Sequence, residues 1–157
     1  MASRPWKAAA MEFTVHSGPW DSGAIEGWLQ KTVIPLRLAT TGGSGPIVQS
    51  LWFLYDDGAL WCATQSDSMV AGRVRREPRV GWEVSPDEPP YRGARGRGTL
   101  TVVEDPDLAG DVLRRLIARY GQQGTDLERW LLSRVATEVA LRIDDLAVTS
   151  WDFSPRM

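Results

Sequence analysis

The sequence predicts a mainly β fold, an antiparallel β-barrel with short peripheral helices. Six or seven apolar segments follow the two-residue alternation that is typical of strands. Most of them are joined by turn signals rather than by long helical crossovers, which argues against a doubly wound parallel sheet. At 157 residues the chain fits one domain, because two separate cores would each be small.

The N-terminal segment differs in character from the rest of the chain. Residues 1–20 lack periodicity and contain two prolines and a glycine, which predicts a flexible arm. The single domain is therefore expected to cover 21–157. It opens with a short amphipathic helix at about 22–32, for which Ser22 or Asp21 would be the N-cap.

The later elements follow from alternation, helical spacing and chain breakers. Asp56-Asp57-Gly58 is a strong hairpin signal between two apolar strands, because Asp-Gly suits the positive φ of such turns. Gly93, Gly96 and Gly98 lie in a long strand and indicate a bend or the close approach of another backbone or a ligand. The expected strands cover 34–40, 47–55, 59–64, 79–85, 91–104, 138–143 and 147–153, and the expected helices cover 69–76, a segment opening at 105–107, and about 126–135.

The composition argues against several classes of function. The net charge of −2 disfavours a nucleic-acid-binding protein, which needs an excess of basic side chains. No apolar run reaches the roughly 20 residues that span a bilayer, and the N-terminal sequence lacks the apolar core of a signal peptide. The single cysteine, Cys62, excludes an internal disulfide and fits the reducing cytoplasm. The single histidine, His16, argues against a histidine-based metal site or triad.

Tryptophan is unusually frequent, with eight in the chain. Each tryptophan brings a large apolar area and one N–H donor, so the residue is favoured in cores, interfaces and stacking sites. We expect most of these side chains to lie in the core and in a dimer interface.

The segment from Thr64 to Ser68 carries the strongest chemical signal. A strand that feeds a helix through this turn would present free N–H groups, the helix dipole and the hydroxyls of Thr64, Ser66 and Ser68 to one anion such as a phosphate. The alternative is that the polar side chains only cap the helix, with Ser66 or Asp67 as the N-cap. The residues alone leave both interpretations open.

Five motifs occur in a fixed order along the chain. They are Leu51–Gly58, Ala63-Thr64, the serine-containing helix that ends at Glu77–Val80, Pro90–Gly98, and Arg142-Ile143 followed by Ser150–Phe153. From Ile34 to the C-terminus their order and spacing resemble the pyridoxamine 5′-phosphate oxidase-like family. The resemblance implies a split β-barrel that forms homodimers. It also implies FMN, or in some branches the deazaflavin coenzyme F-420, bound in a cleft between subunits.

The resemblance further implies a set of cofactor-binding residues. These are Ser50, Leu51, Trp52, Thr64, Gln65, Ser66, Ser68, Met69, Val70, Arg73, Trp82, Tyr91 and Arg92. The strand from Ser50 to Trp52 would run beneath the flavin ring, and Trp82 and Tyr91 would wall it. We assign no catalytic side chain and no metal ligand, because a flavin-type cofactor carries the hydride or electron chemistry at its own ring.

The chain departs from the family pattern at the phosphate. Members that bind FMN typically show a threonine, three further residues and then Ser-Arg-Lys, in which the two cations hold the phosphate. Here Thr64 and Ser68 match, but the cations fall on Met69 and Val70. Charge-assisted contacts to phosphate are strong, so their loss weakens the expected site. Arg73 would have to reach back to the phosphate, or the arginines of the glycine-rich strand would have to compensate.

Three functions therefore stay open. The first is an FMN-dependent oxidoreductase acting on a small organic molecule, and the second is a deazaflavin-dependent reductase with an arginine-rich cleft. The third is a non-catalytic protein that holds a flavin, haem or no ligand. All are expected to be cytoplasmic homodimers with no nucleic-acid or membrane partner. The substrate cannot be inferred, because it would bind in loops that the sequence does not position.

Overall fold

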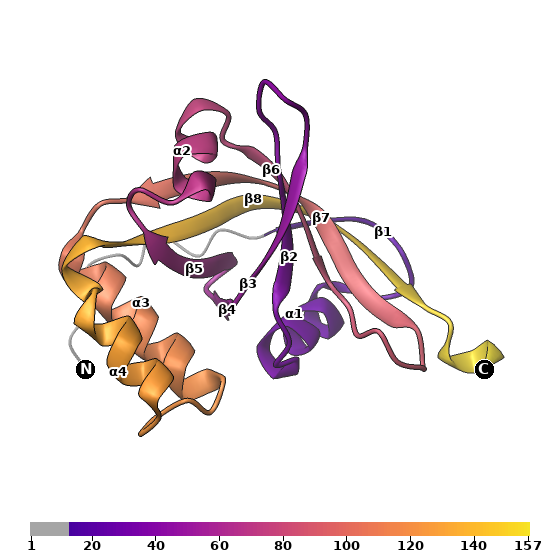
Figure 1. Ribbon diagram of the computed structural model, residues 1–157. Helices are drawn as coiled ribbons and strands as arrows, with labels where there is room; N and C mark the ends of the chain where they lie inside the picture. The colour runs from indigo at the N-terminus through magenta and orange to yellow at the C-terminus, as the bar shows by residue number, and fades with distance from the viewer. Residues whose placement is uncertain (1–12) are drawn as a thin grey trace.

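The computed structural model describes residues 13–157, which fold around one strongly curled sheet with helices at its periphery (Figure 1). The strands are β1 (Thr14–Ser17), β2 (Leu36–Thr40), β3 (Ile47–Leu51), β4 (Leu54–Asp56), β5 (Ala59–Gln65), β6 (Arg79–Val84), β7 (Arg92–Val103) and β8 (Glu138–Asp152). The helices are α1 (Ser22–Lys31), α2 (Met69–Arg76), α3 (Pro106–Arg119) and α4 (Asp126–Ser133), with short 3-10 turns η1 (Val135–Thr137) and η2 (Ser154–Arg156). The predicted mainly β, split-barrel fold with short peripheral helices is confirmed.

The curl of the sheet follows from the connection between β3 and β4. The strands run in the order β3-β2-β6-β7-β8-β5-β4, which puts β3 and β4 at opposite ends of this path. Only Trp52 and Phe53 separate the two strands in sequence, so the sheet must curl until its ends lie close together. The Tyr120 hydroxyl holds this crossing, because it accepts from the Phe53 N–H at 3.1 Å and donates to the Ile34 carbonyl at 2.8 Å.

The interior of the curl is the main apolar core. Phe53, Leu38 and Leu141 are fully buried there, and α1 closes one end with the equally buried Ile25 and Leu29. A second apolar cluster lies between α3 and the strands β4, β5 and β8. The helix α4 has no buried residue, so it contributes little to either core.

Turn chemistry is as predicted at the hairpin between β4 and β5. Asp57 and Gly58 have φ values of 54° and 80°, the left-handed conformation that Asp-Gly turns require. The expected helix cap before α1 is also present, because the Asp21 carboxylate accepts the Ala24 N–H at 2.9 Å. Local sequence signals therefore fix both of these boundaries.

The glycines of β7 mark a close approach of backbones, as predicted. A Cβ on Gly96 would stand 2.3 Å from the carbonyl oxygen of Ala147 and 3.0 Å from the Trp82 ring. The pairing of β7 with β8 is irregular at Gly98, where two residues of β8 stand against one of β7. Side chains on these glycines would force the two longest strands apart.

Two expected strand assignments were wrong. The segment 47–55 forms two strands, because the chain leaves one end of the sheet and joins the other at Trp52 and Phe53. The segments 138–143 and 147–153 belong to a single strand, β8. Asp145 has a φ of 52° and produces a bulge there, not a reversal of the chain.

Two details near helix starts also differ from expectation. Ser68 caps α2, where Ser66 or Asp67 was expected, because its Oγ accepts the Ala71 N–H at 3.2 Å. The predicted N-terminal arm falls partly on residues 1–12, which lie outside the described residues. The remainder of that segment contains β1, which pairs in parallel with β8.

Candidate functional site

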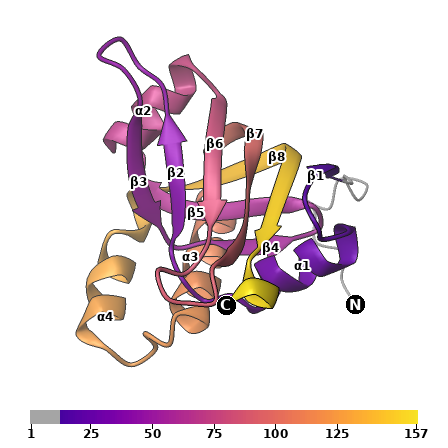
Figure 2. The same cartoon turned by 90° about the vertical axis from the view of Figure 1, so that its right-hand side faces the viewer.

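One face of the sheet, formed by β3, β2, β6, β7 and β8, is turned away from the core (Figure 2). Strand register places one row of outward residues across it. Val48, Ala39, Gly81, Arg97 and Ala147 are successive cross-strand partners. Three of the five have no side chain beyond a methyl group, so the row forms a shallow floor.

A second row, one pleat further along, is charged. Arg37 pairs with Glu83, Glu83 with Arg95, and Arg95 with Thr149. Arg37 donates to the Ser85 carbonyl at 3.0 Å. Arg95 lies over the Trp151 ring at 5.3 Å from its centroid. These contacts hold two guanidinium groups beside the floor.

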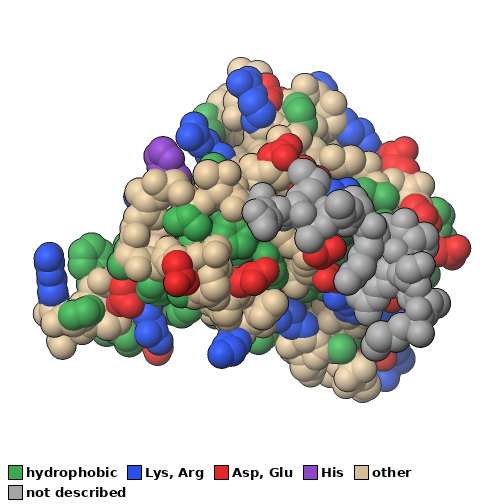
Figure 3. Space-filling model, turned by 180° about the vertical axis from the view of Figure 1, so that it is seen from behind, with side chains coloured by type: hydrophobic (Ala, Val, Ile, Leu, Met, Phe, Trp, Pro, Cys, Tyr) green, Lys and Arg blue, Asp and Glu red, His purple; other side chains and the backbone are tan. Residues whose placement is uncertain are grey.

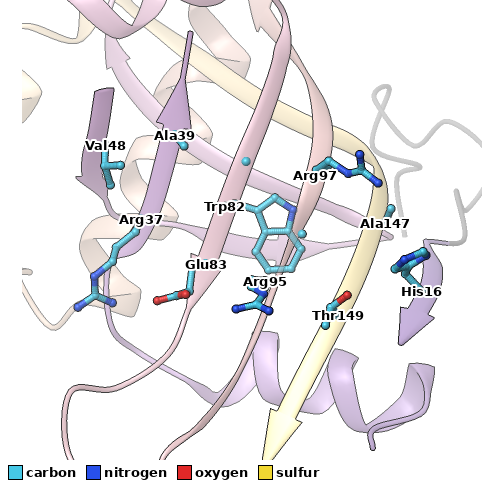
Figure 4. Close-up of a pocket in the computed structure, with 12 residues that line it drawn as sticks. His16, Arg37, Ala39, Val48, Trp82, Glu83, Arg95, Arg97, Ala147 and Thr149 are labelled. Carbon is cyan, nitrogen blue, oxygen red and sulfur yellow. The ribbon is translucent and has the colours of Figure 1, made fainter. Parts of the chain in front are cut away.

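The two rows line a hollow of about 460 Å³, to which β1 adds His16 at one side (Figure 4). Trp82 also lines this hollow, although it packs in the main core and is only 3% exposed. Gly96 leaves space for the ring, because a Cβ at this position would stand 3.0 Å from it. The Trp82 Nε1–H is buried without a hydrogen-bond partner among the described residues. We call this region the open-face hollow.

The segment in which the sequence placed a phosphate lines a different, smaller hollow. It lies between the end of β5, the start of α2 and α4, and has a volume of about 360 Å³. We call it the α2 hollow. Its lining residues are Ala63, Thr64, Gln65, Asp67, Ser68, Trp130, Leu131, Arg134 and Glu138. Thr64 and Ser68 are thus brought together as predicted.

Gln65 and Ser66 make internal contacts in this segment. The Gln65 amide donates to the Arg134 carbonyl at 3.1 Å and to the Glu138 carboxylate, and its Oε1 accepts from the Thr137 hydroxyl at 2.5 Å. Arg75 donates to the Ser66 carbonyl at 2.8 Å and to its hydroxyl at 3.1 Å. The contacts of Gln65 and Ser66 therefore stabilise the loop between β5 and α2.

The residues that replace the family's two cations point in different directions. Met69 is 57% exposed, whereas Val70 is 3% exposed and packs in the main core. Only the first position is able to present a side chain to a ligand. The structure therefore does not support a direct cofactor contact from Val70.

Arg73 is committed to the turn between β2 and β3. Its guanidinium is buried and donates to the Thr40 hydroxyl at 3.0 Å, the Thr40 carbonyl at 3.2 Å and the Gly45 carbonyl at 2.6 Å. A Cβ on Gly42 would stand 2.5 Å from this guanidinium, which explains the glycine there. The expectation that Arg73 reaches back to a phosphate is not met, because these carbonyls hold it elsewhere.

The predicted strand beneath the ring divides among three environments. Ser50 is exposed and pairs with Arg37 at the edge of the open face. Leu51 pairs with Leu36 and packs against the main core. Trp52 stacks on Tyr120 with ring centroids 4.8 Å apart. Of the three, Ser50 is placed to face a ligand on the open face.

Tyr91 and Arg92 lie far from the α2 hollow within one chain. Arg92 pairs with Asp152 at the end of β8, whereas Thr64 pairs with Val139 near its start. Arg92 lies over the Trp28 ring at 5.6 Å from its centroid, and Tyr91 is 47% exposed. A shared site for these residues would need a second copy of the chain.

Sequence reasoning missed several lining residues, although alternation could have found some of them. Arg37 and Ala39 lie on the same face of a strand that was expected, and Glu83 follows the same two-residue period. Glu138 and Trp130 gave no local signal, because only the packing of α4 and β8 against the start of α2 brings them to the α2 hollow.

Cys62 is fully buried, as expected for an inert core thiol, and burial raises its pKa to about 12. His16 is exposed, as expected. Across residues 13–157 no cluster of three or more histidine, cysteine, aspartate or glutamate side chains is placed to hold a metal ion. Within the same residues no helix has the length and apolar character to cross a membrane.

Comparison with known families decides the assignment. The family model described as pyridoxamine 5′-phosphate oxidase matches residues 25–142. That span runs from α1 into β8 and includes β2, β3, β5, β6 and β7. The chain belongs to the pyridoxamine 5′-phosphate oxidase family. A search of curated proteins finds no match to it.

Several solved structures are similar to this chain. A conserved hypothetical protein, Rv2991 from Mycobacterium tuberculosis, is 26% identical, with a TM-score of 0.73 over 85% of this chain and 86% of that one. A structure named F420 reductase is 25% identical, with a TM-score of 0.66 over 78% of this chain and 94% of that one. An FAD-binding protein from Mesorhizobium loti, at 20% identity and a TM-score of 0.61 over 83% and 93% of the two chains, shows the fold alone.

Proposed function

We propose that this chain is a homodimeric oxidoreductase that binds a deazaflavin cofactor on its open sheet face and acts on a small organic molecule. FMN is the alternative cofactor. The family membership and the side chains that line the two hollows both support this proposal.

The shape and the charged border of the open-face hollow are the main support for this proposal. Ala39, Gly81 and Ala147 leave room for a flat ring system to lie on the strands. Arg95 and Arg97 border it, and the Glu83 carboxylate lies between Arg37 and Arg95 in the neighbouring row. Guanidinium groups bind carboxylates and phosphates well. A deazaflavin carries an acidic tail, so an arginine-bordered floor suits both of its parts. The Trp82 Nε1–H, which has no hydrogen-bond partner within residues 13–157, adds one buried donor at the hollow.

The α2 hollow fits the phosphate of FMN poorly. Neither Met69 nor Val70 offers a cation, and Arg73 is held by the β2–β3 turn. Asp67 and Glu138 place two carboxyl groups beside a single arginine, Arg134. The similarity to a structure named F420 reductase supports the deazaflavin over FMN.

The protein's own residues would bind and orient the cofactor. When bound, a deazaflavin supplies hydride chemistry at its ring. Arg95 is already held in place by its contact with the Trp151 ring, so little order is lost when it meets an anionic group. Arg37 is held by the Ser85 carbonyl and by the Asp87 carboxylate at 2.8 Å, so its charge is already paired. The Cys62 thiol is buried and its pKa is raised, so it does not serve as a nucleophile. The protein's contribution is therefore position and electrostatics.

A homodimer would complete the site. The open face exposes apolar surface such as Val48, which is 66% exposed, and a second copy would cover it. For Tyr91 and Arg92 to share the site, this end of one chain would have to approach the opposite end of its partner. On the face shown in Figure 3 basic and acidic side chains are interspersed, so this face lacks the basic patch that a nucleic acid would need.

Titration with the deazaflavin and with FMN, followed by fluorescence, tests the proposal. The wild type should bind the deazaflavin saturably and FMN more weakly. Arg97→Ala should weaken deazaflavin binding about tenfold or more, because it removes a charge-assisted contact worth about 1.5–3 kcal/mol. Arg76→Ala, at an exposed arginine at the end of α2, is the matched control and should leave binding unchanged. Equal effects of both variants would show that the open face holds no ligand.

A further inference from the structure

The α2 hollow has the hydroxyl groups of a phosphate site but not its charges. Thr64 and Ser68 stand where family members contact the cofactor phosphate, and both line the hollow. The Ser68 Oγ caps the helix, which leaves its O–H free to donate. Polar donors alone would still favour an anion there, so the charged groups decide what binds.

Glu138 is the buried charged group of this hollow. It is 7% exposed and pairs with Gln65 across β5 and β8. Gln65 donates to its carboxylate, which fixes the direction of the side chain. Burial is the largest influence on the Glu138 carboxyl and raises its pKa, while the Gln65 hydrogen bond and the Arg134 charge act in the opposite direction.

The other charged side chains around the hollow do not make it favourable for an anion. Arg134 is the one cation of the lining, and its guanidinium lies over the Trp130 ring at 4.5 Å from the centroid. Asp67 adds a second, exposed carboxylate. Arg75, beside the same loop, is paired with Glu104 at 2.7 Å. A phosphate dianion would therefore meet at least as much negative as positive charge.

We propose that Glu138 is a specificity-determining residue that keeps the phosphate of FMN out of the α2 hollow. It acts by repulsion from a fixed and poorly screened position, because a buried carboxylate is screened less by salt than an exposed one. The proposal rests on the proposed function only in taking the chain to bind a flavin-type ring. The α2 hollow therefore lacks the two cations that would attract a phosphate, and it also carries a carboxylate that repels one.

Two ligands that share a ring and differ in phosphate isolate this effect. FMN and riboflavin are titrated into wild type and Glu138→Gln, and the ratio of their affinities is compared. On the alkaline side of the raised pKa of Glu138, where the carboxyl is ionised, Glu138→Gln should raise the preference for FMN over riboflavin about tenfold. The glutamine keeps the volume and an acceptor for Gln65, and a thermal melt checks that the variant is folded.

The pH profile separates charge from shape. As the pH falls through the raised pKa of Glu138, the carboxyl takes up a proton and loses its repulsion. On the acidic side of that pKa, the wild-type preference for FMN should approach that of Glu138→Gln. The phosphate takes up one proton with a pKa near 6 but keeps one negative charge, so its protonation reduces the repulsion in the wild type without abolishing it. Full convergence of the two proteins therefore requires Glu138 to lose its own charge. Asp67 and Arg134 also face the hollow, and both are retained in the variant.

Two control variants sharpen the result. Asp67→Asn removes the exposed carboxylate of the same hollow and should give a smaller gain. Glu88→Gln removes an exposed carboxylate in the loop between β6 and β7 and should give none. An equal gain for FMN and riboflavin, or no gain in FMN affinity, overturns the role of Glu138. Failure of the wild type to bind the deazaflavin would instead count against the proposed function, which the riboflavin comparison does not use.

Discussion

Replacing Val70 by lysine tests whether this position is core or ligand site. The family pattern places a phosphate-binding lysine here, whereas the structure places Val70 in the main core at 3% exposure. Loss of the valine's apolar burial costs about 1.5–3 kcal/mol. Burying an ammonium group without a partner costs about 4 kcal/mol at neutral pH, for a pKa lowered by about three units.

The expected result is therefore severe destabilisation with no gain in binding. A total loss near 6 kcal/mol is a large part of a typical stability of about 5–15 kcal/mol. It lowers the melting temperature by roughly 10–20 °C for a chain of this size. The loss should shrink as the pH rises toward about 10, because the lysine of the unfolded chain also becomes neutral there.

The neighbouring position supplies the control. Met69→Lys adds the same side chain at a residue that is 57% exposed, so its melting temperature should stay within a few degrees of the wild type. Calorimetry measures stability, and an FMN titration follows binding in both variants. If Val70→Lys melts like Met69→Lys and binds FMN more tightly, the placement of Val70 in the core is refuted.

Three further predictions address the framework. Arg73→Ala should lower the free energy of unfolding by about 2–4 kcal/mol, because it removes the buried hydrogen bonds to Thr40 and Gly45; denaturant titration measures this, and unchanged stability would contradict the role as a clamp. Gly96→Ala should cost more than about 2 kcal/mol, because its Cβ would meet the Ala147 carbonyl at 2.3 Å, whereas Gly72→Ala, with nothing within 4 Å, should be neutral or stabilising. Cys62, whose pKa is raised to about 12, should resist a thiol reagent at about pH 8 until the chain is unfolded; fast labelling of the folded protein would show that the strand opens.

Much of the fold could be predicted because its signals are local. Alternation identified most strands, and the Asp57-Gly58 pair adopts the positive φ values that the hairpin requires. The strand β1 had no such signal, since its four residues are all exposed. Whether Trp52 and Phe53 continue a strand or cross between sheet ends depends on distant pairing, which alternation does not report.

The candidate site was predicted less completely, for the same physical reason. Thr64 and Ser68 do meet at the start of α2, as the motif implied. The carboxyl of Glu138 comes to the same place through the pairing of β5 with β8, more than 70 positions later in the chain. Arg73 lies on the expected helix, but only the structure shows that backbone carbonyls of another turn hold it.

The most direct measurement of the central claim is a parallel titration of the purified protein with the deazaflavin cofactor and with FMN, repeated with Arg97→Ala. The prediction is saturable binding of the deazaflavin with one site per chain, weaker binding of FMN, and loss of deazaflavin affinity in Arg97→Ala. A wild-type protein that binds neither cofactor, or that binds FMN more tightly than the deazaflavin, would contradict it.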